Sequence, residues 1–201
     1  GFEPVSVEDQ ASLPRRASTI AASALALLEA GVDCAFYYHV QDQTFCRDDF
    51  GTFFSPQGLD LMQVHWNETP HRFGLFGVDG EVRPQYFVFR LLSRMAPQRL
   101  AARSSCADVR VLASGGREVT VLLANHNPQT SSDRVVSVRC DGLAAGCKQL
   151  TTWRLDAERR WDEQALELLP RESRQVETPA SWRAQFYLPA DSVLLARLAP
   201  R

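Results

Sequence analysis

Two short stretches of the sequence hold the side chains best suited to binding a small polar ligand. They are Tyr38, His39, Gln41 and Asp42, directly after an apolar run, and Trp66, Asn67 and Glu68, in a long polar and aromatic segment. Amide, imidazole and carboxylate groups can hold hydroxyl groups, and an aromatic face can stack on a ring. His39 is equally well interpreted as a hydrogen-bonded histidine at a strand end, and Trp66 as a packing anchor of its loop.

Other residue patterns point away from metal, nucleotide and nucleophile chemistry. His65 and His71 are too far apart to form a metal site without a clear third ligand, and the five cysteines show no CxxC spacing. The sequence has no phosphate-binding glycine loop and no Gly-x-Ser-x-Gly elbow. We therefore expect no metal and no cofactor. Asn125-His126-Asn127-Pro128 is most simply a turn between two strands.

Composition excludes two further classes of partner. The chain has 201 residues, 45% of them hydrophobic and 23% charged, with a formal net charge of −2. Arginine supplies nearly all positive charge, since Lys148 is the only lysine, and the arginines are scattered among acids. Nucleic-acid binding is not expected from this distribution. No apolar run is long enough to span a bilayer, so no membrane contact is expected either.

The first half reads as an α/β unit that positions the candidate residues. Residues 13–30 are rich in Ala and Leu with helical spacing, and Gly31 follows where a left-handed cap is expected. The run Asp33–Val40 predicts a strand covered on both faces, as in a parallel sheet. After a long segment from Gln41 to about Thr69, a second helix begins near Pro84 and ends before Pro97.

From about residue 98 the pattern changes to short strands. These cover VRVLAS, REVTVLLAN, RVVSVRC, KQLTTWRL, WRAQFYLP and SVLLARLA, with one helical insertion expected around Asp162 to Leu168. Val119, Val121 and Leu123 should share one face, and Val136, Val138 and Cys140 another. Strands at this spacing favour a β-sandwich or an open barrel. Cys140 and Cys147 could pair across a hairpin or stay free thiols.

The junction between the halves resembles glycoside hydrolase family 39, which includes β-xylosidases and α-L-iduronidases. The resemblance rests on the order of elements and on short phrases. The phrases are Phe73-Gly74-Leu75-Phe76, Asp79-Gly80, Arg83-Pro84-Gln85-Tyr86 and, near the end, Pro189-Ala190-Asp191-Ser192-Val193. It implies that residues 1–97 are the terminal strand–helix units of a (β/α)8 barrel and residues 98–201 a β-sandwich.

The resemblance also implies a function and its limits. A carbohydrate would be the substrate, and O-glycosidic bonds would be cleaved with retention by two glutamates. The acid/base glutamate belongs to a fourth barrel strand outside this chain. Glu3 could be the nucleophile, although a loop carboxylate is the simpler reading. The family more often has Trp and Ser-Asp where this sequence has Tyr38, His39 and Gln41, with Asp42 matching the Asp, so the sugar stays open.

A barrel of this type needs about 250 residues, far more than residues 1–97 supply. The expected partner is therefore the remainder of the barrel, upstream of Gly1. Two alternatives stay open. The chain could be a noncatalytic carbohydrate-binding or structural β-sandwich module, or a degenerate family member kept as a scaffold. The sequence does not indicate a cellular compartment.

Overall fold

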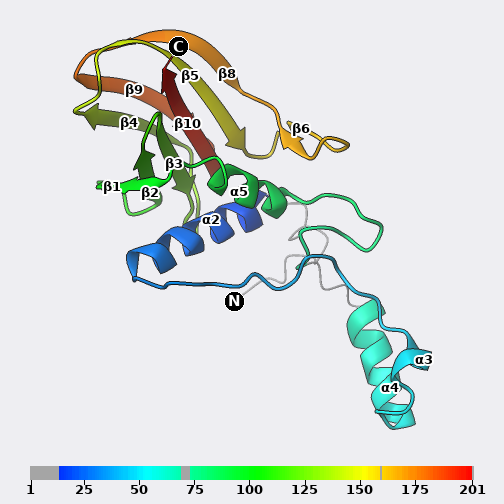
Figure 1. Ribbon diagram of the computed structural model, residues 1–201. Coiled ribbons are helices and arrows are strands. Elements are labelled where there is room, and N and C mark those ends of the chain that lie inside the picture. The colour runs from blue at the N-terminus through cyan, green and yellow to red at the C-terminus, as the bar shows by residue number, and fades with distance from the viewer. Residues whose placement is uncertain (1–13, 69–72, 159, 201) are drawn as a thin grey trace. The chain divides into compact units, whose positions relative to one another are not determined.

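The computed structural model describes residues 14–68, 73–158 and 160–200 (Figure 1). The described residues form two compact units. The smaller comprises residues 36–83, and the larger joins residues 14–35 to residues 84–200. The expected boundary at residues 97 and 98 falls inside the larger unit, because the two flanking helices belong to it. As a division of a longer chain, that boundary stays a prediction.

The described residues of the larger unit form two helices and ten strands. The helices are α2 (Pro14–Glu29) and α5 (Pro84–Leu92). The strands are β1 (Gln98–Leu100), β2 (Val109–Gly115), β3 (Val119–Asn125), β4 (Arg134–Asp141), β5 (Gly146–Leu155), β6 (Trp161–Asp162), β7 (Glu167–Leu168), β8 (Glu172–Thr178), β9 (Ser181–Leu188) and β10 (Ser192–Pro200). The protein is thus mixed α/β, and the helices predicted at residues 13–30 and from Pro84 are confirmed.

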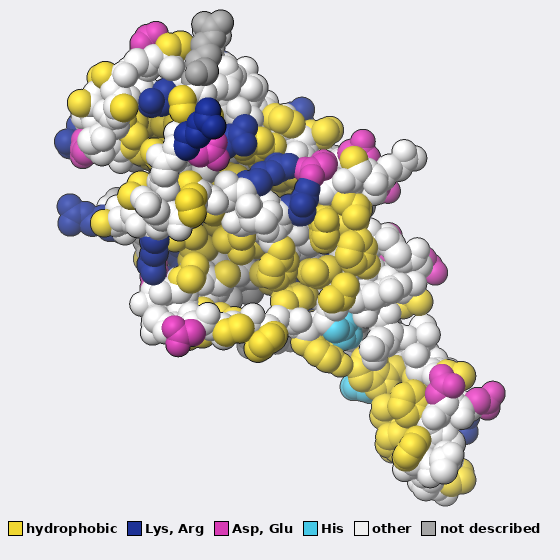
Figure 2. All heavy atoms as spheres, viewed as in Figure 1, with side chains coloured by type: hydrophobic (Ala, Val, Ile, Leu, Met, Phe, Trp, Pro, Cys, Tyr) yellow, Lys and Arg dark blue, Asp and Glu magenta, His cyan; other side chains and the backbone are white. Residues whose placement is uncertain are grey.

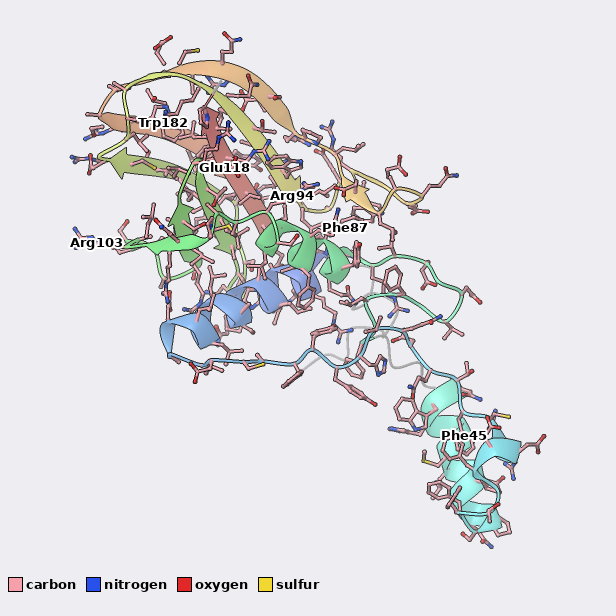
Figure 3. All side chains as sticks on the ribbon, in the orientation of Figure 1. Phe45, Phe87, Arg94, Arg103, Glu118 and Trp182 are labelled. Carbon is pink, nitrogen blue, oxygen red and sulfur yellow. The ribbon has the colours of Figure 1, made fainter. Side chains whose placement is uncertain are left out.

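The main sheet has six antiparallel strands in the order β1-β2-β3-β10-β5-β8, and β4 pairs with β9 in a second sheet. Alternation along β3 separates two buried faces. Val121 and Leu123 pack in one core with Trp182 and Phe186 of β9. Trp182 is labelled in Figure 3. Val119, Val136, Val138 and Cys140 pack against that core. Both predicted strand faces are therefore confirmed, and the two sheets form a sandwich.

The second face of the six-stranded sheet lies under the helices. Leu122 of β3 and Leu195 of β10 have no exposed surface and alternate with the residues of the sandwich core. α2 contacts β3 and β10, while α5 contacts α2 and β5. Phe87 of α5 is also completely buried. The sheet is thus covered on both sides, by β4 and β9 on one and by α2 and α5 on the other.

Polar and ionic contacts join the helices to the sheet side of the unit. Ser18 of α2 is fully buried, and its Oγ lies 3.1 Å from His126 Nδ1 and 3.3 Å from Asp191 Oδ1. Arg94, just beyond α5, lies 4.8 Å from the ring centroid of Trp153 in β5. The contacts of Ser18 satisfy a hydroxyl group that the packing of α2 removes from water.

Two expectations for secondary structure are wrong. The helical insertion expected at residues 162–168 is a hairpin of β6 and β7. Asp162 Oδ1 accepts hydrogen bonds from the amides of Gln164 and Ala165, which favours a tight turn over a helix.

The strand expected at Asp33–Val40 is absent from the described structure. The backbone there is largely exposed, and its nearest β contact is a single parallel bridge between Gln41 and Phe76. A buried parallel strand requires a ladder of hydrogen-bonded neighbours, and at the end of this run the amides of Leu75 and Phe76 donate to the carbonyls of His39 and Val40 without forming such a ladder. An apolar run by itself therefore does not make a strand here.

The structure has no disulfide bond between Cys140 and Cys147. All five cysteines, each within the described residues, are free thiols, so Cys140 and Cys147 are not bonded to each other. Burial raises the pKa of the Cys140 thiol, with a smaller contribution from the nearby Asp141 carboxylate. Cys140 therefore serves as a packing residue of β4.

The smaller unit has three described parts. They are an extended segment (residues 36–46), a helical excursion (residues 47–68) and a return segment (residues 73–83). The excursion contains α3 (Arg47–Phe50), α4 (Pro56–Gln63) and a π-helical turn, η1 (Val64–Glu68). Ser55 starts α4, since its side chain accepts a hydrogen bond from the Gly58 amide at 3.1 Å, and Pro56 occupies the first turn. Figure 2 shows hydrophobic side chains on the surface of the α3 and α4 region.

Candidate functional site

An aromatic hollow lies within the smaller unit. It is open, has a volume of about 380 Å³, and is lined by Tyr38, His65, Trp66 and Phe73. The rings of His65 and Trp66 meet edge to face at a centroid distance of 5.6 Å. Three aromatic rings and one imidazole thus surround a concave, mostly apolar surface. Such a surface suits the apolar face of a ring-shaped ligand.

Three sequence segments supply these residues. Tyr38 belongs to the extended segment, His65 and Trp66 to η1, and Phe73 to the return segment. The extended and return segments are joined by hydrogen bonds, since the amides of Leu75 and Phe76 donate to the carbonyls of His39 and Val40. The Tyr37 hydroxyl also donates to the Phe73 carbonyl at 2.5 Å. The peptide bond between Tyr38 and His39 is cis.

A buried ionic cluster lies beside the extended segment. The Asp42 carboxylate is almost fully buried and pairs with Arg83, with 2.5 Å between Oδ2 and Nη1. Its Oδ1 accepts a hydrogen bond from the Gly74 amide at 2.6 Å and lies 3.2 Å from His39 Nε2. Asp42, which precedes the excursion, therefore contacts Gly74 near the start of the return segment and Arg83 at its end.

Gly74 is required by this close approach. A Cβ atom at that position would lie 2.4 Å from the Phe76 carbonyl oxygen and 2.6 Å from the Asp42 amide nitrogen. Both neighbours are backbone atoms, so they cannot move aside cheaply. The glycine of the junction phrase thus allows the return segment to reach Asp42.

Two hydrogen bonds between Asn67 and Phe45 hold the two ends of the excursion together. The Asn67 side chain accepts from the Phe45 amide at 2.7 Å and donates to the Phe45 carbonyl at 2.9 Å. Phe45 is buried and stacks on Phe50 at a centroid distance of 5.0 Å. Asn67 is the neighbour of Trp66, so this closure also places Trp66 at the hollow.

The structure brings some of the expected site residues together and separates others. Tyr38 and Trp66 both line the hollow. Asp42 and Asn67 are engaged by other parts of the chain, while the exposed Gln41 side chain donates to the Val78 carbonyl at 3.1 Å. The side chain of Glu68 and the whole of Glu3 lie outside the described residues.

Sequence reasoning missed Arg83, Phe73 and His65 as members of this region. Arg83 and Phe73 belong to the junction phrases, which carried a family signal without assigning a role to either side chain. His65 was considered only as a metal ligand. Its neighbour Trp66 and the aromatic content of the excursion were the available signals.

The described residues that line the hollow include no carboxylate. Acid–base cleavage of a glycosidic bond uses two carboxyl groups, so the described lining does not supply that pair. Among the described residues, no three His, Cys, Asp or Glu side chains are grouped to hold a metal ion. The described helices also include none long and apolar enough to cross a membrane.

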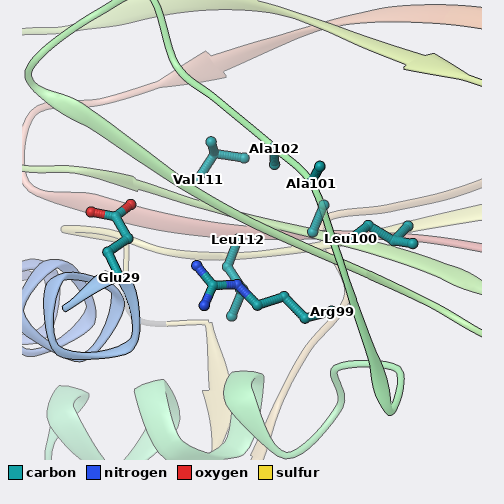
Figure 4. A pocket seen from close by; sticks show the side chains of 8 residues that line it. Glu29, Arg99, Leu100, Ala101, Ala102, Val111 and Leu112 are labelled. Carbon is teal, nitrogen blue, oxygen red and sulfur yellow. The ribbon is translucent and has the colours of Figure 1, made fainter. Parts of the chain in front are cut away.

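The larger unit has a hollow of its own, of about 430 Å³, beside the edge strand β1 (Figure 4). Its charged lining residues are Glu29 at the end of α2 and Arg99 of β1. Glu29 pairs with Arg110 at 3.0 Å, and Arg99 donates to the Leu28 carbonyl at 3.1 Å. Both charges are thus engaged within the unit, and the hollow offers no aromatic face.

Comparison with known proteins identifies a fold. No family model and no curated protein matches the sequence. Among solved structures, a monomeric β-xylosidase from Caulobacter crescentus CB15 matches all of this chain and 44% of its own, with 16% identity and a TM-score of 0.66. A GH39 enzyme from Xanthomonas axonopodis pv. citri matches all of this chain and 43% of its own, with 16% identity and a TM-score of 0.65.

A glucosidase from Croceicoccus marinus is also similar. It matches 94% of this chain and 43% of its own, with 15% identity and a TM-score of 0.63. The chain therefore spans less than half the length of each of these structures. At these identities the likeness concerns the fold, and the chain resembles a portion of glycoside hydrolase structures, GH39 among them.

Proposed function

We propose that this chain is the C-terminal portion of a glycoside hydrolase that cleaves O-glycosidic bonds with retention, and that its aromatic hollow is part of the sugar site. The observation that carries the proposal is the hollow formed by Tyr38, Trp66, His65 and Phe73. In a barrel enzyme the substrate-binding side chains lie at the C-terminal face of the barrel, and we assign the hollow to that face of the complete enzyme.

The match to solved structures supports the same reading. The superposition on the Caulobacter β-xylosidase includes the whole chain, so it involves both units and the sandwich. Because that enzyme is a β-xylosidase, a β-xyloside is the first substrate to test. On this proposal residues 1–97 belong to the end of the barrel and residues 98–201 to the accessory domain.

Exposed apolar side chains support an additional covering element. Phe36, Tyr38 and Val40 alternate along the extended segment and are 93%, 68% and 65% exposed. These three exposed side chains make up an apolar stretch of the chain. A preceding barrel strand and its neighbours would cover such a stretch, and we propose them as its partner.

The proposal assigns the catalytic pair to residues beyond the described site. The acid/base glutamate would lie on an upstream barrel strand, and Glu3 remains the candidate nucleophile of this chain. The hollow would then bind and orient the sugar ring while the carboxylates act on it. The 201-residue chain alone is accordingly expected to bind without turning substrate over.

Calorimetric titration of the chain with methyl β-D-xylopyranoside tests the binding part. We expect saturable binding that is lost in Trp66→Ala and kept in Phe53→Ala. Phe53 is a matched control because it is an exposed aromatic residue of the same unit outside the hollow. Equal binding by both variants would place the sugar elsewhere and contradict the proposal.

Assay of a longer product tests the catalytic part. The coding sequence upstream of Gly1 should encode further strand–helix units, with an Asn-Glu pair on the fourth. A protein that includes them should hydrolyse p-nitrophenyl β-D-xyloside or a related aryl glycoside. Binding without turnover by that longer protein would favour the degenerate scaffold.

The noncatalytic β-module makes a different prediction. It requires residues 98–201 to fold and bind sugar alone. That piece lacks α2 and α5, which bury Leu122 and Leu195. Saturable sugar binding by a folded 98–201 fragment would nevertheless establish it.

A further inference from the structure

His39 lies between the buried ionic cluster and the aromatic hollow. Its Nε2 is 3.2 Å from Asp42 Oδ1, and the side chains of His39 and Asp42 are only 9% and 4% exposed. Its ring also contacts Tyr38, at a centroid distance of 4.5 Å and an interplanar angle of 61°. Tyr38 in turn lines the hollow, which His39 does not.

The charges around Asp42 decide which imidazole nitrogen carries the proton. Arg83 is always positively charged and pairs with Oδ2, while the Gly74 amide donates to Oδ1. A carboxylate held this way only accepts hydrogen bonds. The nitrogen of His39 that faces it must therefore donate, so Nε2 carries the hydrogen.

The second nitrogen has the opposite requirement. His39 Nδ1 is buried and has no hydrogen-bond partner among the described residues. A proton placed there would lose its hydration without gaining an acceptor, which is the costlier of the two states. Both nitrogens thus favour the same tautomer, with hydrogen on Nε2 and none on Nδ1.

We propose that Arg83 and Asp42 make His39 a positioning residue, whose ring is held in the Nε2–H form and sets the orientation of Tyr38 at the wall of the hollow. This inference rests on the proposed sugar site. It deepens that site by making ligand affinity depend on a side chain that does not line the hollow. His39 acts through Tyr38, because the Tyr38 ring is its link to the lining.

Nitrogen-15 NMR of the histidine-labelled 201-residue chain tests the protonation state without any ligand. Spectra recorded at about pH 8.5, where imidazole in water is neutral, should show the His39 signals of a protonated Nε2 and a bare Nδ1. The signals are assigned by their loss in His39→Gln. The reverse form, with hydrogen on Nδ1, would overturn the inference whatever the chain binds.

A double-mutant cycle tests the route through Tyr38. His39→Gln keeps an N–H donor for Asp42 but removes the ring that packs on Tyr38. With methyl β-D-xylopyranoside as the probe, we expect His39→Gln to weaken binding by about tenfold. In a Tyr38→Ala background the same change should have no further effect, since the residue that His39 positions is gone.

The outcomes separate this inference from the proposed function. Equal losses from His39→Gln in both backgrounds mean that His39 acts otherwise, and the inference falls while the sugar site stands. An unchanged thermal unfolding midpoint in His39→Gln excludes a loss through unfolding. If no sugar binds although the Nε2–H form is observed, the proposed function fails, and the positioning role fails with it.

Discussion

The larger unit, residues 14–35 with 84–200, and the smaller unit, residues 36–83, are stabilised in different ways. The larger one buries aliphatic and aromatic side chains on both faces of its six-stranded sheet, including Leu122, Leu195 and Trp182. In the smaller one the buried side chains include the ion pair of Asp42 and Arg83, and several aromatic residues are exposed.

On the proposed function, the larger unit supplies most of the stability and the smaller unit supplies the binding surface. A core of apolar side chains supplies most of the free energy of folding. A buried ion pair contributes little net stability, but it fixes geometry, since each partner is costly to leave alone. We infer that the larger unit folds as the scaffold, while the smaller unit is organised around a binding surface.

The largest expected effect on folding comes from two deletions, one that removes the smaller unit and one that removes the helices of the larger unit. Replacing residues 36–83 by a Gly/Ser linker of about 12 residues should leave the larger unit folded, because both of its helices remain. A fragment of residues 98–201 should not fold, since one face of its sheet would be uncovered. Circular dichroism during heating compares the two, and a cooperative transition in the shorter fragment would break the comparison.

Breaking the ion pair of Asp42 and Arg83 should also cause a large loss of stability, but only within the smaller unit. Asp42→Leu leaves Arg83 buried without its partner, for which about 3–5 kcal/mol is expected. Hydrogen exchange should show faster opening of residues 36–83, with protection in β3 and β10 unchanged. The double variant Asp42→Leu with Arg83→Met should recover part of the loss, because no charge is then left unpaired. Uniform loss of protection would show that the units unfold together.

A substitution in the apolar core should instead destabilise the larger unit. Leu195→Ala creates a cavity between the sheet and the helices and should lower the free energy of unfolding by about 2–5 kcal/mol. Leu61→Ala is the matched control, since Leu61 is largely exposed on α4, and a change within about 0.5 kcal/mol is expected. Urea denaturation measures both, and similar effects of the two would contradict the contrast between the units.

The smallest effect concerns acid stability of the larger unit. Hydrogen bonds from Arg134 and Asn127 lower the pKa of Asp108 below its ordinary value of 3.8. A carboxyl group with a lowered pKa in the folded state adds stability above pH 3.8, and this stability is lost as the pH falls through the lowered pKa. Asp108→Asn should therefore destabilise the protein at neutral pH, and the difference from the wild type should shrink in acid.

The control for this prediction removes the main cause of the shift. In an Arg134→Gln background, Asp108→Asn should show a weaker pH dependence, because the guanidinium no longer pairs with the carboxylate. Urea midpoints measured between about pH 2 and pH 7 give the comparison. A pH dependence unaffected by Arg134→Gln would assign the shift to other groups.

Much of the larger unit was predictable because its signals are local. The Ala- and Leu-rich spacing of α2, the first-turn proline of α5 and the alternation of β3 and β4 each lie within one element. β8 was missed because its sequence, ESRQVET, is charged and forms an exposed edge of the sheet. Edge strands lack the apolar alternation that sequence reasoning uses.

The sequence by itself determined the helices α2 and α5, most strands and their buried faces, and it singled out Tyr38 and Trp66, since periodicity and residue type are properties of neighbouring positions. It did not predict α3 and α4, which lie in the long segment after Gln41. Only the tertiary structure decided that Asp42 meets Arg83 and Gly74, that Asn67 closes on Phe45, and that residues 33–40 form no strand. These outcomes depend on which distant segments supply hydrogen-bond partners, and the order of residues along a chain does not state that.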